Sequence, residues 1–520
     1  MRCVLLVALL STAAFGQNAF ETADVHVSAP TANRTSPPTM RGGALRGGRF
    51  EVRTATMVDL ISFAYDMESD KILSGPNWLD WDRFDVAAKA PPATTREDLI
   101  LMLQKLLADR FQLVVRKDIK PMPAYALTVG KGKPKVKEAS KSGEPGCQGV
   151  PQNPAPGTVP YVVISCHNVT MAAFAEVLGG YARGIYFSDP VVDQTGLNGA
   201  WDFDLKFTQR NRLAQAGSDG ISLFDAVDKQ LGLKLEAKKV PLPVLVVDRV
   251  NESPTPNEPG VATKIPPAPP AEFDVATIKP SPPDAVGQNG RIQPGRLELH
   301  NFTLKQLVQA AWDLPNNDEM VAGVPKSADS ARYDVVAKVA TSGTVNAQDI
   351  DEDSLRLMLR SFLADRFGLK THMEDRPVSA YTMTAGKQTK LQKADPQNRT
   401  GCKQGAGASP MLNRLITCQN TSMTQFAAAL QDMASGYVKA PIRDATGIEG
   451  NFDFSVNFSG VGLLPGRAFD PNATSETSDP NGSLSLPEAL QKQLGLKLEM
   501  GKRPLPVLVI DHVEDKPSAN

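Results

Sequence analysis

The chain repeats itself, and this repetition restricts its fold more than any other feature of the sequence. The segment RFDVAAK (Arg83–Lys89) returns as RYDVVAK (Arg332–Lys338), and QLGLKLE occurs twice. Matched segments stay about 250 residues apart along the chain, and self-similarity at a fixed period indicates that one structural unit is used more than once. The sequence therefore predicts two tandem repeats, residues 17–250 and residues 272–515.

Each repeat also shows a fainter similarity between its own halves. When Leu103 is aligned with Leu223, the apolar positions match without a gap as far as Val129. The second repeat behaves in the same way when Leu363 is aligned with Leu490. We therefore expect two related sub-modules in each repeat. Their bounds are about 20–130 and 159–250 in the first repeat and about 273–386 and 411–514 in the second, followed by a tail of residues 516–520.

A hydroxyl residue precedes an apolar helical stripe once in each of these four sub-modules. Its oxygen is expected to accept a hydrogen bond from an unpaired amide of the first helical turn, as an N-cap does. Three of the four belong to Asn-x-Thr/Ser triplets, which also fit the acceptor pattern for N-glycosylation. Capping explains a hydroxyl at this place in all four. The predicted N-caps are Thr56, Thr170, Thr303 and Ser422.

The segment LADRF ends an amphipathic helix in both repeats. In the first repeat Leu107 and Phe111 fall on the apolar side of this helix, whereas Asp109 and Arg110 are expected to face water. Helices alternate with hairpin-like strand pairs along the chain. This order predicts an α+β fold of two tandem repeats, each with two related modules whose helices pack on small, mainly antiparallel sheets.

Residues 251–271 separate the two repeats and are rich in proline. Such a density of proline is incompatible with a continuous helix or a central strand. We expect this segment to be a semi-rigid, extended linker.

The first residues have the plan of an export signal. Arg2 is followed by an apolar run and by small residues that end at Gly16, which predicts a secretory signal peptide over residues 1–16. An uncleaved anchor is the alternative, but the run is shorter than the ~20 apolar residues that span a bilayer. The mature chain is therefore expected to be exported, periplasmic or secreted, without an integral membrane segment after cleavage of the signal.

Four cysteines remain after the signal is removed, in two similarly placed pairs. An even cysteine count in an exported chain is typical of disulfides. A zinc site is the alternative, but His167 follows Cys166 whereas Gln419 follows Cys418, and there is no CxxC motif. We expect no metal or cofactor. The predicted disulfides are Cys147–Cys166 and Cys402–Cys418.

Charge argues against a nucleic-acid partner. The chain has 56 basic and 57 acidic residues, so it lacks the basic surplus that displaces counterions from a phosphate backbone.

The residues that could carry catalysis give no consistent pattern. His26 aligns with Lys279 and His167 with Gln419, so a histidine-dependent site would exist in one repeat only. Acidic residues recur, among them those matching Asp85 and Asp202. Two carboxylates about 5–10 Å apart across a cleft could hydrolyse a glycoside. Asp85 and Asp202 also alternate with apolar neighbours, as residues do on the wet side of a half-buried strand.

Three aromatic residues of the first repeat form a candidate ligand patch: Tyr65, Trp78 and Trp81. Aromatic side chains bind glycans by stacking, but they also fill cores and interfaces. The second repeat keeps neither tryptophan, so a patch of this kind would belong to the first repeat alone.

Several segments in order, including FDVATIKPS, MLQKLLADRFQL and DQTGLNGAWDFDL, resemble the soil-associated protein family, a domain of unknown function in exported proteins of soil bacteria. The resemblance covers nearly all of the mature chain, once per repeat, whereas members usually carry one copy. It implies no catalytic residue or ligand. Some relatives are similar to the extracellular parts of membrane-bound metallopeptidase sensors. The segment LPEALQKQLGLKLE is similar in fold to the short N-terminal domain of secretins and TonB-dependent receptors.

These features favour a non-catalytic, exported binding or scaffold protein whose partner is an envelope protein, a glycan or a small ligand. Two repeats on a tether would gain avidity if both reach one partner. An extracytoplasmic hydrolase with paired carboxylates and a ligand-sensing domain are the alternatives. Carboxylates that converge in one cleft would favour the hydrolase, and a deep apolar pocket in each repeat would favour the ligand-sensing domain.

Overall fold

A computed structural model describes most of the chain. The predicted signal peptide, residues 1–16, lies outside the described residues. These are 19–28, 39–91, 93–139, 144–151, 158–182, 185–187, 189–267, 272–293, 295–314, 317–339, 352–396, 398–406, 413–460 and 484–518.

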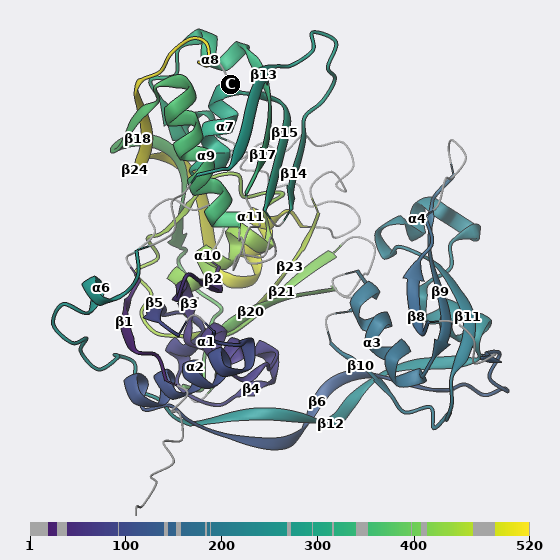
Figure 1. The fold of residues 1–520 in the computed structure, drawn as a ribbon. Helices are drawn as coiled ribbons and strands as arrows, with labels where there is room; N and C mark the ends of the chain where they lie inside the picture. The colour runs from purple at the N-terminus through teal and green to yellow at the C-terminus, as the bar shows by residue number, and fades with distance from the viewer. Residues whose placement is uncertain are drawn as a thin grey trace, which may run out of the picture. The chain divides into compact units, whose positions relative to one another are not determined.

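Among the described residues, four sheets of four strands share one strand order, which confirms the predicted α+β fold (Figure 1). We name them modules A1, B1, A2 and B2 in chain order. In A1 the order is β1 (Thr22–Val27), β5 (Arg83–Lys89), β3 (Arg49–Thr56) and β2 (Arg41–Arg46), and all pairs are antiparallel. The corresponding strands are β7 (Lys137–Glu138), β11 (Trp201–Thr208), β9 (Tyr161–Val169) and β8 (Gly146–Gly149) in B1; β13 (Val275–Pro280), β17 (Arg332–Lys338), β15 (Arg296–Thr303) and β14 (Asn289–Gln293) in A2; and β19 (Gln392–Lys393), β23 (Phe452–Ser459), β21 (Asn413–Thr421) and β20 (Gly401–Ala406) in B2.

The B modules begin earlier than the sequence predicts. The sequence predicts that the second sub-modules start at about residues 159 and 411. In the structure, β7 and β8 come before residue 159, and β19 and β20 come before residue 411. These strands are only two to six residues long, too short to show a clear alternation of apolar and polar side chains.

Helices pack on each sheet, as in A2, where α7 and α9 lie beside the strands (Figure 1). In the B modules the second helix is short and continues as a π-helical turn. The helices are α1 (Met57–Tyr65) and α2 (Arg96–Phe111) in A1; α3 (Met171–Ala182), α5 (Leu223–Ala226) and the turn Val227–Leu231 in B1; α7 (Leu304–Ala311) and α9 (Glu352–Phe367) in A2; and α10 (Met423–Met433), α11 (Leu486–Ala489) and the turn Leu490–Leu494 in B2. Short helices also occur at α4 (Leu213–Ala216), α6 (Val261–Lys264) and α8 (Lys326–Ser330).

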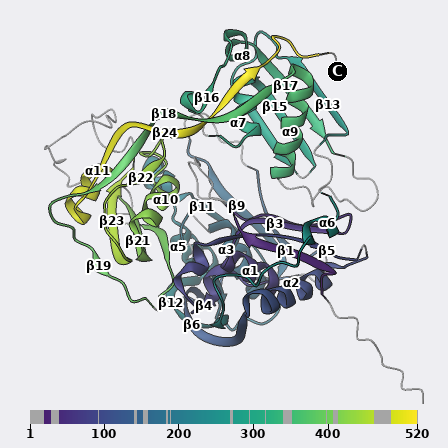
Figure 2. The same ribbon diagram turned by 90° about the vertical axis from the view of Figure 1, so that its left-hand side faces the viewer.

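Two long strands connect the modules of the second repeat. β18 (Lys370–Ala385) and β24 (Leu496–His512) pair antiparallel along nearly their whole length (Figure 2). Pro377 lies directly opposite Pro504, and the alignment of the half-repeats makes the same two prolines equivalent. A residue that faces its own equivalent lies on a twofold axis. The two halves of this repeat are therefore related by an approximate dyad at the proline pair.

Each module of the second repeat is completed by the far end of the other module's long strand. Leu508 and Ile510, near the end of β24, lie in the A2 core, where β24 pairs in parallel with β16 (Val321–Ala322). Tyr381 and Met383, near the end of β18, lie in the B2 core, where β18 pairs in parallel with β22 (Ile442–Asp444). Cutting between the modules would therefore remove core residues from both.

The first repeat shows the same exchange. Leu245 of β12 (Leu233–Arg249) lies in the A1 core and pairs in parallel with Ile72 of β4 (Ile72–Leu73). Leu127 of β6 (Val114–Val129) lies in the B1 core, where β6 pairs in parallel with β10 (Val191–Asp193). β12 thus contributes to both cores of this repeat, with Leu233 and Leu235 in B1 and Leu245 and Val247 in A1.

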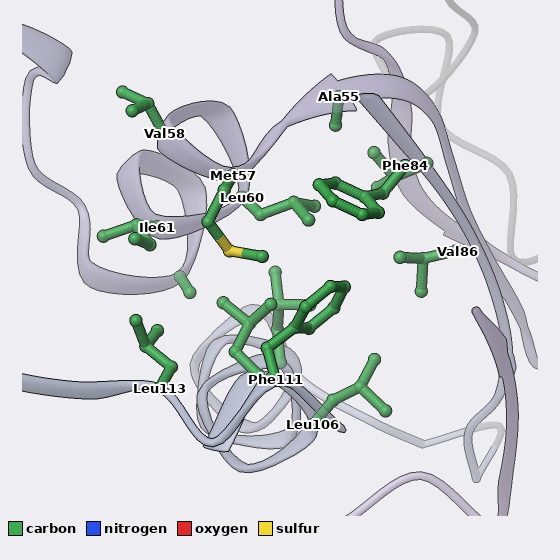
Figure 3. Close-up of a cluster of buried hydrophobic side chains, with 14 of the residues drawn as sticks. Ala55, Met57, Val58, Leu60, Ile61, Phe84, Val86, Leu106, Phe111 and Leu113 are labelled. Atoms are coloured by element: carbon green, nitrogen blue, oxygen red, sulfur yellow. The ribbon is translucent and has the colours of Figure 1, made fainter. Parts of the chain in front are cut away.

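The A1 core shows how the sequence pattern produces this packing. Alternate residues of β5 are buried, and the apolar side of α2 meets them. Figure 3 shows Phe84 and Phe111 facing each other, with ring centroids 4.9 Å apart at an interplanar angle of 78°. Both rings are fully buried, and complete burial of a phenylalanine contributes about 1.5–3 kcal/mol. This contact explains the aromatic residue at the end of LADRF.

Within the part of the chain that the structure describes, no helix is both long and apolar enough to cross a membrane.

Candidate functional site

In each module the residue two positions before the cap of the first helix is a non-glycine residue with a left-handed backbone. In A1, B1 and A2 the strand register shifts beside this residue, which defines a β-bulge. Asparagine tolerates the left-handed region better than most residues. The residues are Thr54 (φ 51°), Asn168 (φ 50°), Asn301 (φ 64°) and Asn420 (φ 45°).

We call these four left-handed residues the bulge residues, after the three beside which a register shift occurs. A carboxylate on the neighbouring strand accepts a hydrogen bond from the backbone amide of each of them. The four acceptors are recurring acidic residues, so one contact repeats throughout the molecule. Hydrogen bonds to a charged group typically contribute about 1.5–3 kcal/mol. The N···O distances are 2.7 Å from Thr54 to Asp85, 2.7 Å from Asn168 to Asp202, 2.9 Å from Asn301 to Asp334 and 2.7 Å from Asn420 to Asp453.

The four predicted capping residues lie at the starts of α1, α3, α7 and α10. In each case the side-chain oxygen accepts from the backbone amide three residues later. The Asn-x-Thr/Ser triplet therefore has two structural roles, because its asparagine adopts the left-handed conformation and its hydroxyl residue accepts this bond. The distances are 3.0 Å from Asp59 to Thr56, 3.2 Å from Ala173 to Thr170, 3.3 Å from Gln306 to Thr303 and 3.2 Å from Gln425 to Ser422.

We expect Thr303→Ala to lower the free energy of unfolding by about 1 kcal/mol, the usual effect of losing an N-cap. Urea denaturation followed by circular dichroism would measure it. Thr303→Ser keeps the accepting oxygen and should stay close to the wild type. Equal losses in both variants would show that the methyl group, and not the cap, carries the effect.

In the A modules a serine and a histidine also approach the bulge carboxylate. Ser281 Oγ donates to Asp334 at 2.6 Å, and His300 Nδ1 lies 3.4 Å from the same carboxylate. In a catalytic triad the imidazole lies between the hydroxyl and the carboxylate. Here the carboxylate lies between the other two groups, so the order is not that of a triad. In A1, Ser28 Oγ donates to Asp85 at 2.6 Å, but the histidine near this carboxylate is His26 of β1, which aligns with Lys279 and not with His300.

The three aromatic residues predicted as a ligand patch have different environments. Trp78 packs edge-on against Phe84 with ring centroids 6.2 Å apart, and Tyr65 packs on the same core. Burial raises the pKa of the Tyr65 hydroxyl. Of the three, Trp81 exposes the most surface, at 38%. Tyr65 and Trp78 are half-buried and pack on the A1 core, so part of their surface serves this core.

Both cysteine pairs are disulfide-bonded. The Sγ–Sγ distances are 2.03 Å for Cys147–Cys166 and 1.99 Å for Cys402–Cys418. Cys147 lies directly opposite Cys166 in the pairing of β8 with β9. The bond therefore fastens an edge strand of the B1 sheet to its neighbour, and the second disulfide lies on β20 and β21 at the same place in B2.

The first part of the predicted linker is packed against A1. We call residues 251–265 the strap. Arg110 donates to Thr255 Oγ1 at 2.9 Å, to Asn257 Oδ1 at 2.6 Å and to the carbonyl of Ala23 at 3.2 Å. Val261 is 6% exposed. The sequence predicted an extended linker over residues 251–271 and a water-facing Arg110. In the structure residues 251–265 contact A1, residues 261–264 are helical, and Arg110 is only partly exposed.

Side-chain amides complete the edges of three strands. Asn257 accepts from the Val25 amide at 3.0 Å and donates to the Val25 carbonyl at 3.1 Å. A carboxamide that makes both bonds takes the place of a neighbouring strand and protects the edge from pairing with another chain. The other two pairs are Gln230 with Lys206 on β11, at 3.0 and 2.7 Å, and Gln493 with Asn457 on β23, at 2.9 and 2.7 Å.

Asp82 lies beside Glu252 at the start of the strap. The pKa of Asp82 is raised, first by burial and then by the hydrogen bond with Glu252 and the negative charge of Glu252. A carboxyl group whose pKa rises on folding destabilises the fold above that pKa. It has no such effect at a pH below its pKa in the unfolded chain, which is about 3.9.

Asp82→Asn removes one negative charge and keeps a hydrogen-bond donor toward Glu252. We expect it to raise the melting temperature near pH 7 and to leave it unchanged near pH 3, as measured by circular dichroism. Asp365→Asn, at an exposed site, is the matched control. An equal rise at both pH values would mean that the charge of Asp82 is not the cause.

Among the described residues, no group of three or more His, Cys, Asp or Glu side chains is placed to hold a metal ion. The recurring polar residues contact backbone groups of their own modules instead. Together with the shared strand order, this defines a class: a disulfide-bonded α+β repeat protein whose recurrent side chains fix its backbone. More particularly, the chain belongs to the family described as "Protein of unknown function (DUF3738)", whose model matches residues 58–250 and 305–513. The predicted tandem arrangement of a domain of unknown function is thus confirmed.

No curated protein and no solved structure matches the chain.

Proposed function

We propose that this protein is an exported, non-catalytic binding or scaffold protein. The observation that carries the proposal is the use of the recurring carboxylates. Asp85, Asp202, Asp334 and Asp453 each accept a hydrogen bond from the backbone amide of a bulge. Equivalent side chains in four modules thus have one structural task.

The electrostatics of Asp334 also favour a structural role. Burial would raise the pKa of Asp334, but hydrogen bonds from Ser281 and the Asn301 amide, together with His300, outweigh burial and lower it. A general acid needs a pKa near the working pH, so that it holds a proton to give. A carboxylate with a lowered pKa stays ionised and suits the role of a permanent acceptor.

Three further features support the finer parts of the proposal. Disulfides are typical of proteins that work outside the cytoplasm, and the first residues have the plan of a signal peptide. Carboxamides occupy three strand edges, which restricts strand pairing with other chains. The partner would then be an envelope protein, a glycan or a small ligand that contacts loops and helix surfaces.

The proposal is tested with the full mature chain, immobilised and incubated with envelope extract, and in parallel with a panel of polysaccharides and peptides. We expect saturable capture of a defined partner by the native chain, no capture by heat-denatured chain, and no cleavage of the panel. Asp85→Asn and Asp202→Asn are the diagnostic variants. Cleavage by the wild type that either variant abolishes while remaining folded would establish the hydrolase alternative.

A further inference from the structure

Arginines of A1 form ion pairs with aspartates of A2. The Arg41 guanidinium group, on β2, lies 2.6 Å from Asp353 and 2.8 Å from Asp313. Asp353 is the second residue of α9, and Asp313 follows α7. Arg53 of β3 lies 3.7 Å from the Asp353 carboxylate. Both arginines belong to the first repeat and both aspartates to the second, so these ion pairs join the two repeats.

The Asp353 carboxylate requires such partners because it is buried. Its side chain is 8% exposed. A carboxylate that is removed from water destabilises the fold unless cations and hydrogen-bond donors surround it. Arg356 of the same helix lies 3.6 Å away, which is further than Arg41 at 2.6 Å. Among the described residues, the closest cation to this carboxylate therefore comes from the other repeat.

Two further contacts hold the same hairpin of A1. Arg46 Nη1 donates to Ser354 Oγ of α9 at 2.8 Å, and Arg49 Nη1 donates to the carbonyl of Pro266 at 2.8 Å. β13, the first strand of A2, begins at Val275, nine residues after Pro266. Nine residues span at most roughly 30 Å. A2 therefore stays close to the hairpin, and this high effective concentration allows a small interface to hold it.

The basic half of the interface occurs in the first repeat only. In A2 the strand pairing places Asn289 and Gln293 of β14 at the positions equivalent to those of Arg41 and Arg46. Neither residue carries a charge. The hairpin of A2 therefore cannot form the same ion pairs.

The acidic half occurs in both repeats. Asp66 follows α1 with a left-handed backbone, as Asp313 follows α7, with φ angles of 48° and 53°. Glu97 is the second residue of α2, as Asp353 is of α9. If each repeat carried both halves, contacts of this head-to-tail type could continue from chain to chain into open fibres. With the basic half on A1 alone, the contact ends after two repeats.

We propose that the β2–β3 hairpin of A1 is a docking surface whose partner is the acidic face of A2, formed by Asp313 and Asp353. The docking is directional, from the arginines of the first repeat to the aspartates of the second. The linker then does not separate two independent modules, and an external partner meets A1 and A2 together. This inference does not depend on the proposed function.

Distances between spin labels on the two repeats test the proposal in the full mature chain. Labelled cysteines replace Leu101 on α2 and Ile292 on β14, which are 45% and 46% exposed. Arg399 of B2 also donates to Asp80 of A1, at 3.0 Å. The reference chain and all variants therefore carry Arg399→Ala, so that this second contact does not hide an effect. We expect one narrow distance distribution in the reference chain.

Arg41→Ala leaves the buried Asp353 carboxylate without its closest partner. The ratio of docked to undocked chains should fall about a hundredfold or more, as expected when one partner of a buried ion pair is removed, and the distance distribution should broaden. Arg41→Gln keeps a long polar side chain and should give a smaller fall. Arg291→Ala, which removes an exposed arginine from the hairpin of A2, is the matched control and should leave the distribution narrow.

A double variant shows whether Arg41 acts through Asp353. Asp353→Asn alone should also weaken docking, because the arginines lose their charged acceptor. In the combination of Arg41→Ala with Asp353→Asn the buried charge and its partner are both absent, so the combined fall should be much smaller than the product of the two single falls. Thermal unfolding followed by circular dichroism checks that each variant is folded. A narrow distribution that persists in folded Arg41→Ala and Arg41→Gln, or a broad one in the reference chain, overturns the proposal.

Discussion

Replacing Asp334 with alanine is expected to lower the free energy of unfolding by about 2–3 kcal/mol, because hydrogen bonds to a charged group are lost. The Asp334 carboxylate accepts from the Asn301 amide at 2.9 Å and from Ser281 Oγ at 2.6 Å. Without it, a residue in the left-handed conformation loses the acceptor that holds its amide. Urea denaturation followed by circular dichroism would measure the loss.

The same variant has a predicted pH signature. The pKa of Asp334 is lower in the folded chain than in the unfolded chain. The carboxylate therefore stabilises the fold fully at a pH above its unfolded-state pKa of about 3.9. This stabilisation is lost as the pH falls through the folded-state pKa. Asp334→Ala should therefore destabilise near pH 7 and have a much smaller effect near pH 2. Asp365→Ala, at an exposed site that also recurs, should change stability by less than about 0.5 kcal/mol. Equal effects of the two variants would contradict the structural role of Asp334.

Removing the Cys147–Cys166 disulfide by a double substitution to serine is expected to cost about 3 kcal/mol, the entropic value for a loop of this size. The bond joins residues 19 apart in sequence and holds the edge strand β8 on β9. Thermal unfolding and hydrogen exchange of β8 would measure the change. The second disulfide, which joins residues 16 apart, should give a similar value.

Chemical reduction supplies the control for both disulfides. Reducing buffer should lower the free energy of unfolding of the wild type by the sum of the two single losses. The two disulfides lie in different modules, and the effects of independent sites add. An unchanged melting temperature in the double-serine variant would show that β8 is held by other contacts.

The sequence was sufficient where the relevant signal is local. A hydroxyl before an apolar stripe is local, and the structure places Thr56, Thr170, Thr303 and Ser422 accordingly at helix starts. The α+β class and the tandem arrangement follow from periodicity and repetition, which a single sequence also contains.

Contacts between distant residues were not accessible in this way. The alignment made Pro377 and Pro504 equivalent, but only strand pairing shows that they face each other. Asp334 was recognisable as recurring, but its role depends on the bulge of a neighbouring strand. Arg110 contacts Thr255 across 145 residues of sequence, which neither helical periodicity nor proline content could reveal.

One missed feature had a sequence signal. Asparagine stands at the bulge in three of the four modules, two residues before the cap. Asparagine favours the left-handed region, so its recurrence at this place indicates a positive φ angle as well as a helix start.

The exchange of long strands changes how the protein can be dissected. Leu245 and Leu127 each complete the core of the module at the far end of their own strand. A fragment that contains A1 but ends before β12 would therefore expose part of its core. Binding and stability are best measured on the full chain or on whole repeats.

Amide exchange at the four bulges, compared among Asp85→Ala, Asp202→Ala, Asp334→Ala and Asp453→Ala, tests the central claim most directly. If the recurring carboxylates hold the backbone, each substitution raises exchange at the bulge of its own sheet, at Thr54, Asn168, Asn301 or Asn420, and leaves the other three unchanged. Unchanged protection at all four bulges, together with the loss of a measurable activity, would contradict this account.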